Sequence, residues 1–580
     1  MVVFATLVVY WPVQTFHFVN YDDPAFITNN PRMQEGLSLR NLGWAFTVSI
    51  AANWHPLTTI THLIDCSLYG PDAGGHHVTG LLIHLAAAVA LYLLLRRLTL
   101  SFGVRLLVTG LFALHPLNVE SVAWVSERKN VLSQLFLFLT LWAYTAYART
   151  RSRRDYALAL VLFIAGLLSK SMLVSVPVLL VLLDFWPLRR GSLADARTAL
   201  RDALRLLPEK LPFVALSLAS CVITILTQRA TAVGALESFP IAARLMNAAI
   251  SYVAYVGDMF LPIHLSPFYP YLGMDSGIWR SVVAAALLAG ATAVVWLQRV
   301  RRPYLLVGWL WYVVTLVPVI GLVQVGAQAR ADRYAYMPLI GLFLAVALLA
   351  EELIARVKTR RVTWYAVGGA VLLCLSVMSR AQAMAWYDDE ALFQHALQAL
   401  PEAYADHNKR GTWLAKERHF DEAAQQFEAA VAIKPDFAEA WSNLGQVRLE
   451  QRDPEGAVHC YEEAIRYGPG NPKDLNNLGI ALAGLHRYAE AEERFAQALK
   501  LDPVYPSALF NHAGMLQEQG RTSEAVAEFR SGGALLASKE KLSEALASYE
   551  AALRLAPDDV QAMSSAEELR RQLGASSAKP

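Results

Sequence analysis

The hydrophobic and polar positions divide the chain into two parts with different patterns. From Met1 to about Ser379, long apolar runs such as VTGLLIHLAAAVALYLLL and YLLVGWLWYVVTLVPVIGLV alternate with short polar stretches. Helical runs of this length can cross a hydrocarbon core of about 30 Å. From about Arg380 onward the chain is charged, rich in alanine and helical in its spacing. The pattern predicts an all-α protein, with a polytopic membrane domain at 1–379 and a soluble domain at 380–580.

Basic residues between the apolar runs predict the topology, because lysine and arginine in short loops stay on the cytoplasmic side. Five basic clusters lie at 96–105, 149–154, 189–210, 299–302 and 356–361. Placing spans between them gives about eleven, near 1–16, 78–97, 103–116, 130–148, 156–170, 172–187, 211–228, 280–298, 303–321, 336–355 and 363–379. The first run has neither a basic n-region nor a small-residue cleavage site, so we interpret it as a span rather than a signal peptide.

This topology places four polar segments on the outer face, together with the C-terminal domain in a periplasm-like compartment. The segments are 17–77 as the first outer loop, 115–129, 229–279 as a long outer loop, and 322–335. We expect the apolar stretch at 244–262 to be an interfacial or re-entrant helix. Counting it as a span would move the basic cluster at 299–302 outside.

The C-terminal domain contains a repeat of 34 residues, marked by Pro401, Pro435, Pro469 and Pro503 and by Ala423, Ala457, Ala491 and Ala525. First-helix segments such as WSNLG and LNNLG, and second-helix segments such as AEERFAQALKLDP, resemble tetratricopeptide repeats. Such an α-solenoid is a scaffold that binds peptides or proteins. The register breaks around SGG at 531–533, which predicts a shortened repeat near 531–545.

Composition agrees with a membrane protein and excludes some functions. Hydrophobic residues make up 55% of the chain and charged residues 17%, with a mean hydropathy of +0.32. The net charge of +2 offers no large basic surface, so nucleic acid is not an expected partner. The four cysteines form no CxxC pair, which argues against a zinc site or a disulfide scaffold.

Motifs along the membrane domain resemble those of a known family. They are NYDDPAFITNNP, NWHPLTTITHLIDCSLYG, GGHHVTGLLIHL, FALHPLNVESVAWVSERKNVLS, SKSMLVSVPVLLVLLDFWPL and ADRYAYMPLIG, followed by the repeats. In this order they resemble bacterial relatives of the transmembrane and tetratricopeptide repeat-containing O-mannosyltransferases. The resemblance implies a GT-C fold, a polyprenyl phosphate-linked sugar as donor, and an acidic residue of the first outer loop as base. It implies neither the sugar nor the acceptor.

Asp22 and Asp23 open the first outer loop and are the candidate catalytic residues. Transfer of a sugar to a hydroxyl needs a carboxylate that takes the hydroxyl proton. One aspartate can serve as this base while its neighbour forms hydrogen bonds or raises its partner's pKa. The alternative is an Asx turn entering Pro24, in which the pair has only a structural role. Of the two, Asp22 is slightly preferred as the base.

Outward-facing basic residues are candidates for binding the donor phosphate. Arg128 and Lys129 follow HPLNVESVAWVSE, and Arg330 and Arg333 lie in the last outer loop. The alternative is that they extend toward lipid headgroups. The expected supporting residues are His55, His115, Glu120, Glu127 and Tyr334.

Five histidines of the first outer loop and the following span suggest a metal site only weakly. His55, His62, His76, His77 and His84 lack a compact i, i+4 pair with a nearby carboxylate. We therefore expect no metal and no cofactor, with a divalent cation as the alternative.

The leading hypothesis is a glycosyltransferase of the bacterial inner membrane. It would transfer a mannose-like sugar from polyprenyl phosphate to serine or threonine of an exported protein, on the periplasmic face, with the repeats binding the acceptor or a partner. The alternatives are a membrane-anchored repeat scaffold for an envelope complex and a transporter. Transporters commonly have helices broken at the membrane midplane, whereas the polar residues here gather in the outer loops.

Overall fold

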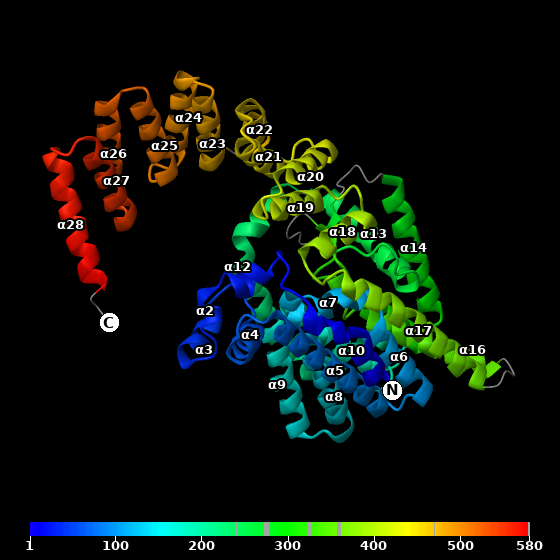
Figure 1. The fold of residues 1–580 in the computed structure, drawn as a ribbon. Helices are drawn as coiled ribbons and strands as arrows, with labels where there is room; N and C mark the ends of the chain where they lie inside the picture. The colour runs from blue at the N-terminus through cyan, green and yellow to red at the C-terminus, as the bar shows by residue number, and fades with distance from the viewer. Residues whose placement is uncertain (239, 272–277, 323–327, 357–360, 469, 578–580) are drawn as a thin grey trace. The chain divides into compact units, whose positions relative to one another are not determined.

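The structure, a computed structural model, describes residues 1–238, 240–271, 278–322, 328–356, 361–468 and 470–577. The chain divides into two compact units, Met1–Pro401 and Glu402–Pro580. Both are helical (Figure 1). The predicted boundary at 379 and 380 falls inside helix α17 (Arg361–Met384), and the first unit continues through helix α18 (Asp389–Ala399).

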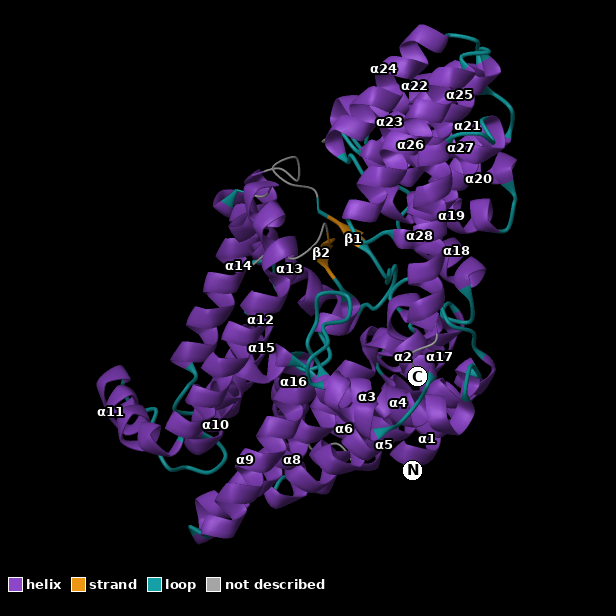
Figure 2. Ribbon diagram, turned by 90° about the vertical axis from the view of Figure 1, so that its left-hand side faces the viewer, coloured by secondary structure: helices purple, strands orange, loops and turns teal. Residues whose placement is uncertain are grey.

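The first unit holds the apolar helices. In chain order they are α1 (Val2–Tyr10), α2 (Pro31–Gln34), α3 (Leu39–Ala45), α4 (Pro56–Tyr69), α5 (Ala73–Arg97), α6 (Phe102–Leu114), α7 (Val119–Ala123), α8 (Arg128–Thr150), α9 (Arg153–Ser169), α10 (Val176–Phe185), α11 (Ala196–Leu206), α12 (Leu211–Ser238), α13 (Ile241–Phe260), α14 (Ile278–Leu297), α15 (Pro303–Leu316), α16 (Leu339–Arg356), α17 and α18. Figure 2 also shows two short strands, β1 (Tyr269–Pro270) and β2 (Gln328–Arg330), which pair antiparallel with Tyr269 opposite Arg330.

Polar residues set where several of these helices begin. Asp72, Ser101 and Ser152 precede α5, α6 and α9, and each side chain accepts a hydrogen bond from a backbone N–H two or three residues further on. Such a cap satisfies one of the N–H groups that a helix start leaves without a partner. At the other end of α5, Arg96 and Arg97 occupy the last turn, where positive charge is favourable.

The number of membrane-crossing helices differs from the sequence prediction. Each of the eleven predicted spans overlaps a helix, but five described segments are long and apolar enough to cross a membrane, namely Ala73–Arg97, Val125–Thr150, Leu211–Gln228, Ile278–Leu297 and Val362–Met384. A sixth results if Phe102–Leu114 and Pro116–Ala123, bent by 54°, form one span. The structure therefore supports five or six such helices rather than about eleven. Others fall short because the helix is only 14 or 15 residues long or contains a 3-10 turn, as in Val2–Thr15, Ser171–Phe185 and Pro303–Leu316.

The apolar stretch at 244–262 forms helix α13, which is not one of these five segments. Two tyrosine hydroxyls join it to α15: Tyr252 donates to the carbonyl of Val313 over 2.7 Å, and Tyr312 donates to the carbonyl of Tyr252 over 2.5 Å. Its interfacial or re-entrant placement stays a prediction.

The second unit is a series of helical hairpins, coloured from yellow to red in Figure 1. Its helices are α19 (Tyr404–Lys416), α20 (Phe420–Ile433), α21 (Ala438–Glu450), α22 (Pro454–Tyr467), α23 (Pro472–Gly484), α24 (Tyr488–Leu501), α25 (Pro506–Glu518), α26 (Thr522–Ser538), α27 (Leu542–Leu555) and α28 (Val560–Ser577). In the first three hairpins, a glycine of the first helix lies against an aromatic ring of the second. An added Cβ would stand 2.7 to 3.0 Å from these rings in the pairs Gly411 with Phe427, Gly445 with Tyr461, and Gly479 with Phe495.

The irregular segment near 531–545 is explained by a fused helix. Helix α26 carries Phe529, which corresponds to the aromatic residue of a second helix, and also Gly533, which faces Tyr549 as a first-helix glycine would. One helix thus ends one repeat and begins the next, so the intervening turn and half of each helix are missing. The sequence prediction of a shortened repeat fits this arrangement.

Candidate functional site

The two neighbouring aspartates lie in the carboxylate loop, residues 16–23, between the 3-10 helix η1 (Trp11–Thr15) and the π-helical turn η2 (Pro24–Thr28). Asp23 is completely buried. Its Oδ2 accepts from the backbone N–H of Val19 over 2.9 Å, and its Oδ1 accepts from the backbone N–H of Ser126 over 3.1 Å and from the Ser126 hydroxyl. Asp23 therefore holds the loop against the turn that precedes α8.

Burial changes the acid strength of Asp23. Removal from water raises its pKa from 3.8 to about 6, although the hydrogen bonds from Ser126 and Val19 act in the opposite direction. The charge of Asp22 adds a smaller increase. A carboxylate whose two oxygens already accept three hydrogen bonds has little room to take a proton from a substrate.

Asp22 has a different environment. Its side chain is 40% exposed, and its Oδ2 lies 3.9 Å from the Nζ of Lys129. The loop thus presents one accessible carboxylate beside a buried ammonium group. Of the two aspartates, Asp22 is the one that a hydroxyl group from outside the protein can reach.

Lys129 belongs to a group that we call the Glu127 cluster, formed by Glu127 with Lys129, Lys170, Glu120 and Arg333. Buried Glu127 lies at its centre, 2.9 Å from Lys129, 3.3 Å from Lys170 and 3.5 Å from Arg333. Arg333 also donates to Glu120, over 2.5 Å from Nη1 and over 2.7 Å from its backbone N–H. With Asp22, the three carboxylates balance the three cations.

The cluster draws on segments far apart in the chain. Glu120 lies on α7, Glu127 ends the 3-10 turn η4 (Val125–Glu127), and Arg333 lies on the 3-10 helix η8 (Asp332–Tyr334). Seven residues apart in the sequence, Glu120 and Glu127 would share one face of a continuous helix. Helix α7 ends before Trp124, whose backbone is extended. Both carboxylates nevertheless reach the same arginine.

Arg330 and Tyr334 lie beside the cluster. The Arg330 guanidinium pairs with Asp258 and stacks 3.8 Å from the centre of the Tyr269 ring. The Tyr334 hydroxyl accepts from the Gln328 side chain over 2.5 Å, and the Arg333 guanidinium lies 5.1 Å from the Tyr334 ring. The nearby carboxylates raise the pKa of Arg333 well above its usual range, against the effect of burial. Arg333 stays charged throughout the physiological range.

Arg128 points away from this cluster. Its buried guanidinium pairs with Asp65 over 2.5 Å and donates to the carbonyls of His76 over 2.7 Å and Thr61 over 3.3 Å. These contacts join α4, α5 and α8. The structure thus gives Arg128 a set of partners of its own, separate from those of Lys129.

The histidines singled out in the sequence, His55, His62, His76, His77, His84 and His115, are buried within the fold. The Nε2 of His115 pairs with the carbonyl of Met259 over 2.9 Å, at the bend after α6. His55 lies close enough to Lys129 and Lys170 to sense their charge, and burial with these two cations lowers its pKa to about 3, so it is neutral. Among the described residues, no group of three histidine, cysteine or acidic side chains could hold a metal ion.

Two members of the site were not among the predicted residues. Lys170, between α9 and the following 3-10 helix, donates to the Asn130 side chain over 2.5 Å as well as pairing with Glu127. Asn130 in turn donates to the Arg333 carbonyl over 3.2 Å. The motif SKSM contains Lys170, and the predicted topology places it on the outer side. The argument that selected Lys129 could therefore have found it.

Residues just before the repeats hold the carboxylate loop. The carbonyl of Tyr387 accepts from the backbone N–H of His17 over 2.9 Å, and Asp389 accepts from the backbone N–H of Asn20 over 2.5 Å. The Tyr21 ring stacks on Phe393, with 5.9 Å between centroids. Helix α18 thus contacts the two residues directly before Asp22, and Tyr387 in front of the helix holds the start of the loop.

A second buried network, the Asp184 cluster, joins α8, α10 and the start of α12. Asp184 pairs with buried Lys210, with Arg190 over 2.7 Å, and accepts from the Tyr144 hydroxyl over 2.9 Å. Arg190 also donates to both oxygens of Glu209, over 2.8 and 2.9 Å. None of the predicted site residues belongs to it.

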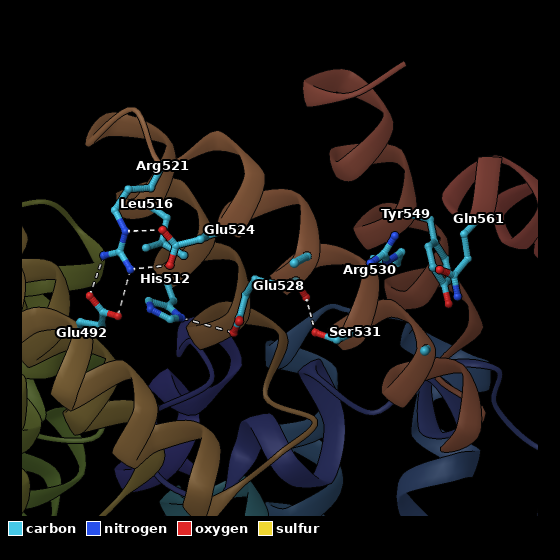
Figure 3. A pocket seen from close by; sticks show the side chains of 12 residues that line it. Glu492, His512, Leu516, Arg521, Glu524, Glu528, Arg530, Ser531, Tyr549 and Gln561 are labelled. Atoms are coloured by element: carbon cyan, nitrogen blue, oxygen red, sulfur yellow. Dashed lines mark hydrogen bonds and ion pairs between the residues drawn. The ribbon is translucent and has the colours of Figure 1, made fainter. Parts of the chain in front are cut away.

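The second unit contains a polar groove of about 640 Å³ (Figure 3). It lies where the fused helix α26 interrupts the repeats, with Glu492 from α24 and Gln561 from α28 at its margins. Arg521 is bound by Glu492 and Glu524, and Glu528 lies 3.3 Å from His512. The groove is therefore lined mainly by charged side chains that already pair with one another.

The second unit matches a known family of repeats. Residues 408–472 and 476–534 match the family model described as a tetratricopeptide repeat. The solved structure of YrrB, a tetratricopeptide-repeat protein with an unusual peptide-binding site, is 21% identical and covers 30% of this chain and 97% of its own, with a TM-score of 0.23.

Curated relatives match both units. Protein O-mannosyl-transferase TMTC3 of Homo sapiens is 34% identical over 107 residues, which is 18% of this chain and 12% of the relative. Protein O-mannosyl-transferase TMTC1 of Homo sapiens is 24% identical over 475 residues, which is 73% of this chain and 54% of the relative. The chain thus spans about half or less of the length of these relatives. It has several membrane-spanning helices, contains tetratricopeptide repeats, and is similar over most of its length to a protein O-mannosyl-transferase.

Proposed function

We propose that the chain is a membrane glycosyltransferase that moves a mannose-like sugar from a polyprenyl phosphate carrier to a hydroxyl group, and that Asp22 is its general base. The observation that carries the proposal is the unequal pair of aspartates. Asp23 fixes the loop, whereas Asp22 is accessible and lies beside Lys129. Similarity to protein O-mannosyl-transferases supports the same class of reaction.

In this mechanism the acceptor oxygen attacks the anomeric carbon of the donor. Asp22 takes the hydroxyl proton as the new carbon–oxygen bond forms. The bond between the anomeric carbon and the carrier phosphate breaks, and the phosphate leaves with the electron pair. Attack from the face opposite the leaving group inverts the anomeric centre.

The leaving phosphate gains negative charge, which a nearby cation can stabilise. Lys129 and Arg333 fit this role because they adjoin Asp22 or its neighbours and keep 7% and 13% of their side chains exposed. Both already pair with carboxylates, so the phosphate would share them with Glu127 and Glu120. Arg330 lies on the adjoining strand. Arg128 is left out, because Asp65 and two carbonyls occupy its guanidinium.

The acceptor in this proposal is serine or threonine of an exported protein, held by the tetratricopeptide repeats. We place the chemistry and the repeats on the periplasmic face of a bacterial inner membrane, in a GT-C-type membrane domain. Support comes from the basic residues at 96–105 after α5, which predict that Asp22 lies on the outer side, and from the Glu127 cluster, which joins Arg333 to the same site. A single cysteine at Met563, which is exposed, should react with an impermeant maleimide in intact spheroplasts. Reaction only after lysis would contradict this placement.

The activity can be tested with purified chain in lipid nanodiscs. The donor is undecaprenyl phosphate carrying tritiated mannose, and the acceptor is a synthetic peptide rich in serine and threonine. We expect tritium in the peptide with the native chain and almost none with Asp22→Asn. Equal transfer by both proteins would remove Asp22 as the base. No transfer by a folded native chain, with the same donor or with glucose in place of mannose, would favour a non-catalytic scaffold.

A further inference from the structure

Helix α11 (Ala196–Leu206) leaves an apolar face uncovered. Leu200 and Leu204 are exposed, whereas Leu206 on the other side is buried. The three arginines of the helix, Arg197, Arg201 and Arg205, are also exposed. Figure 2 shows α11 at the margin of the first unit, beside α10.

The exposed leucines and arginines form two adjoining rows. Residues four apart lie on one side of a helix, so Leu200 and Leu204 form one row. Arg197, Arg201 and Arg205 follow the same spacing and form the next row. The outward surface of α11 is thus half apolar and half basic.

The acidic residues of this segment are turned to local partners instead. Asp195 caps the helix by accepting from the backbone N–H of Thr198 over 2.9 Å. Asp202 accepts from the backbone N–H of Ser192 over 3.0 Å and lies 3.7 Å from Arg201, and its side chain is only 14% exposed. The outward face therefore has positive charge in excess.

The rest of the fold fixes which face of α11 points outward. After Leu206, the chain continues into Glu209, which Arg190 binds with two hydrogen bonds, and into Lys210, which pairs with buried Asp184. Before the helix, the carbonyl of Ala194 accepts from Arg299 over 3.1 Å. Both ends are held, so the leucines cannot turn inward without breaking these contacts.

The position of α11 along the chain places it at a membrane surface. The candidate span Leu211–Gln228 begins five residues after the helix ends at Leu206. A helix of 11 residues joined so closely to the end of a span lies within reach of the headgroup layer.

We propose that α11 lies in the plane of the membrane surface and binds anionic phospholipids. Leu200 and Leu204 enter the acyl region, and Arg197, Arg201 and Arg205 contact headgroup phosphates. An apolar row bordered by basic residues is the pattern of helices that bind anionic membrane surfaces. This inference is independent of the proposed enzymatic activity.

Nitroxide labelling of the full chain tests the proposal. In a variant whose four cysteines are replaced by alanine, one label is placed at Leu204→Cys, and two controls have similar exposure. Exposed fractions are 57% at Leu204, 61% at Leu218 in the candidate span, and 55% at Leu501 in the repeats. In nanodiscs of phosphatidylcholine with phosphatidylglycerol, we expect the labels at 204 and 218 to collide more with oxygen than with a water-soluble nickel chelate. The label at 501 should show the reverse order.

Two results would overturn the apolar half of the proposal. A label at 204 that behaves like the one at 501 would place α11 in water, and a label shielded from both reagents would show that protein covers it.

The ionic half is tested by Arg197→Gln, Arg201→Gln and Arg205→Gln together. This triple variant should make the label at 204 more accessible to nickel, and omission of phosphatidylglycerol should do the same.

The matched control changes three other exposed arginines, Arg149, Arg153 and Arg154, to glutamine. In this control, the accessibility of the label at 204 to oxygen and to the nickel chelate should be unchanged. Identical immersion in pure phosphatidylcholine, or no effect of the α11 triple variant, would show that the arginines do not bind anionic headgroups.

Discussion

The Glu127 cluster and the Asp184 cluster are both buried ion-pair networks of the first unit, but their outermost carboxylates differ in exposure. In the Asp184 cluster, Lys210 and Arg190 converge on one fully buried carboxylate, and both also pair with Glu209, whose side chain is 19% exposed. In the Glu127 cluster each cation likewise has a second polar partner, but one of these partners, Asp22, is 40% exposed. Burial of charge alone therefore does not identify a reactive site. The accessible carboxylate at the edge of the Glu127 cluster distinguishes the two.

The largest expected effect concerns turnover. If Asp22 is the base, Asp22→Asn should lower the rate of sugar transfer by about 10² to 10⁴ without lowering the melting temperature. Asp184→Asn, measured per folded molecule in the same tritium assay, should leave the rate near that of the native chain. Equal losses in the two variants would mean that the clusters do not differ in function.

The stability of the fold should fall more when the Asp184 cluster is changed than when the Glu127 cluster is changed. Asp184→Asn leaves Lys210, whose side chain is fully buried, with only Glu209 at 3.6 Å as a charged partner, which should lower the free energy of unfolding by about 3 to 5 kcal/mol. Glu127→Gln should cost less, about 1 to 3 kcal/mol, because Lys129, Lys170 and Arg333 each keep another partner and are 7 to 13% exposed, so that water can reach them. Unfolding by titration with sodium dodecyl sulfate, followed by circular dichroism, measures both. A larger loss for Glu127→Gln would reverse the comparison.

Asp23 should make the stability of the carboxylate loop depend on pH. Its pKa is raised from 3.8 to about 6 in the folded chain, so the folded state binds the proton more tightly than the unfolded state. Its contribution is therefore full below about pH 4 and is lost as the pH rises to about 6, a change of about 3 kcal/mol. The difference in melting temperature between the native chain and Asp23→Asn, measured from pH 4 to pH 7, isolates the contribution of Asp23 to stability. Parallel pH profiles would show that the Asp23 pKa is not raised.

Asp23→Asn should also lower stability at neutral pH, which separates it from Asp22→Asn. Three donors point at the Asp23 carboxylate, and an amide would direct its own N–H groups toward one of them. A double substitution of both aspartates would therefore combine a structural defect with the loss of the base, and single variants are needed.

The smallest expected effect concerns the donor. Arg333→Lys keeps the charge but loses the guanidinium, which contacts Glu120, Glu127 and Gln328 at once. The kcat/KM for the polyprenyl phosphate donor should therefore fall roughly 10- to 100-fold, which corresponds to about 1.5 to 3 kcal/mol. Arg97→Lys provides the control. Arg97 donates to the carbonyl of Trp142 over 3.0 Å and stacks on its ring, away from any predicted site residue. Equal changes in donor KM would remove Arg333 as a specific phosphate contact.

Periodic features of this fold were predictable from sequence, and contacts between distant segments were not. The step of 34 residues in the prolines and alanines predicted the repeats, and even the fused helix was visible as a break at SGG. The acidic pair was also visible. The different roles of Asp22 and Asp23 could not be predicted, because Asp23 is fixed by Ser126, which lies 103 residues further along the chain.

The continuous apolar runs of the sequence also led to too many predicted membrane spans. A run of apolar letters does not reveal that Trp124 ends helix α7 or that the segment at 171–175 forms a 3-10 turn. Lys170 was overlooked for a related reason. It stands between two apolar runs, where a single cation is easily assigned to a helix end rather than to a site.

The contacts of α18 with the carboxylate loop determine where the chain could be shortened. A truncation at the end of the last apolar helix, Val362–Met384, would remove Tyr387, Asp389 and Phe393, and with them the support of the turn that leads to Asp22. A natural relative without repeats would need to retain the equivalent of residues up to Pro401 to keep that turn in place. The smallest fragment that keeps this turn in place is therefore longer than the part of the chain that ends with the last apolar helix.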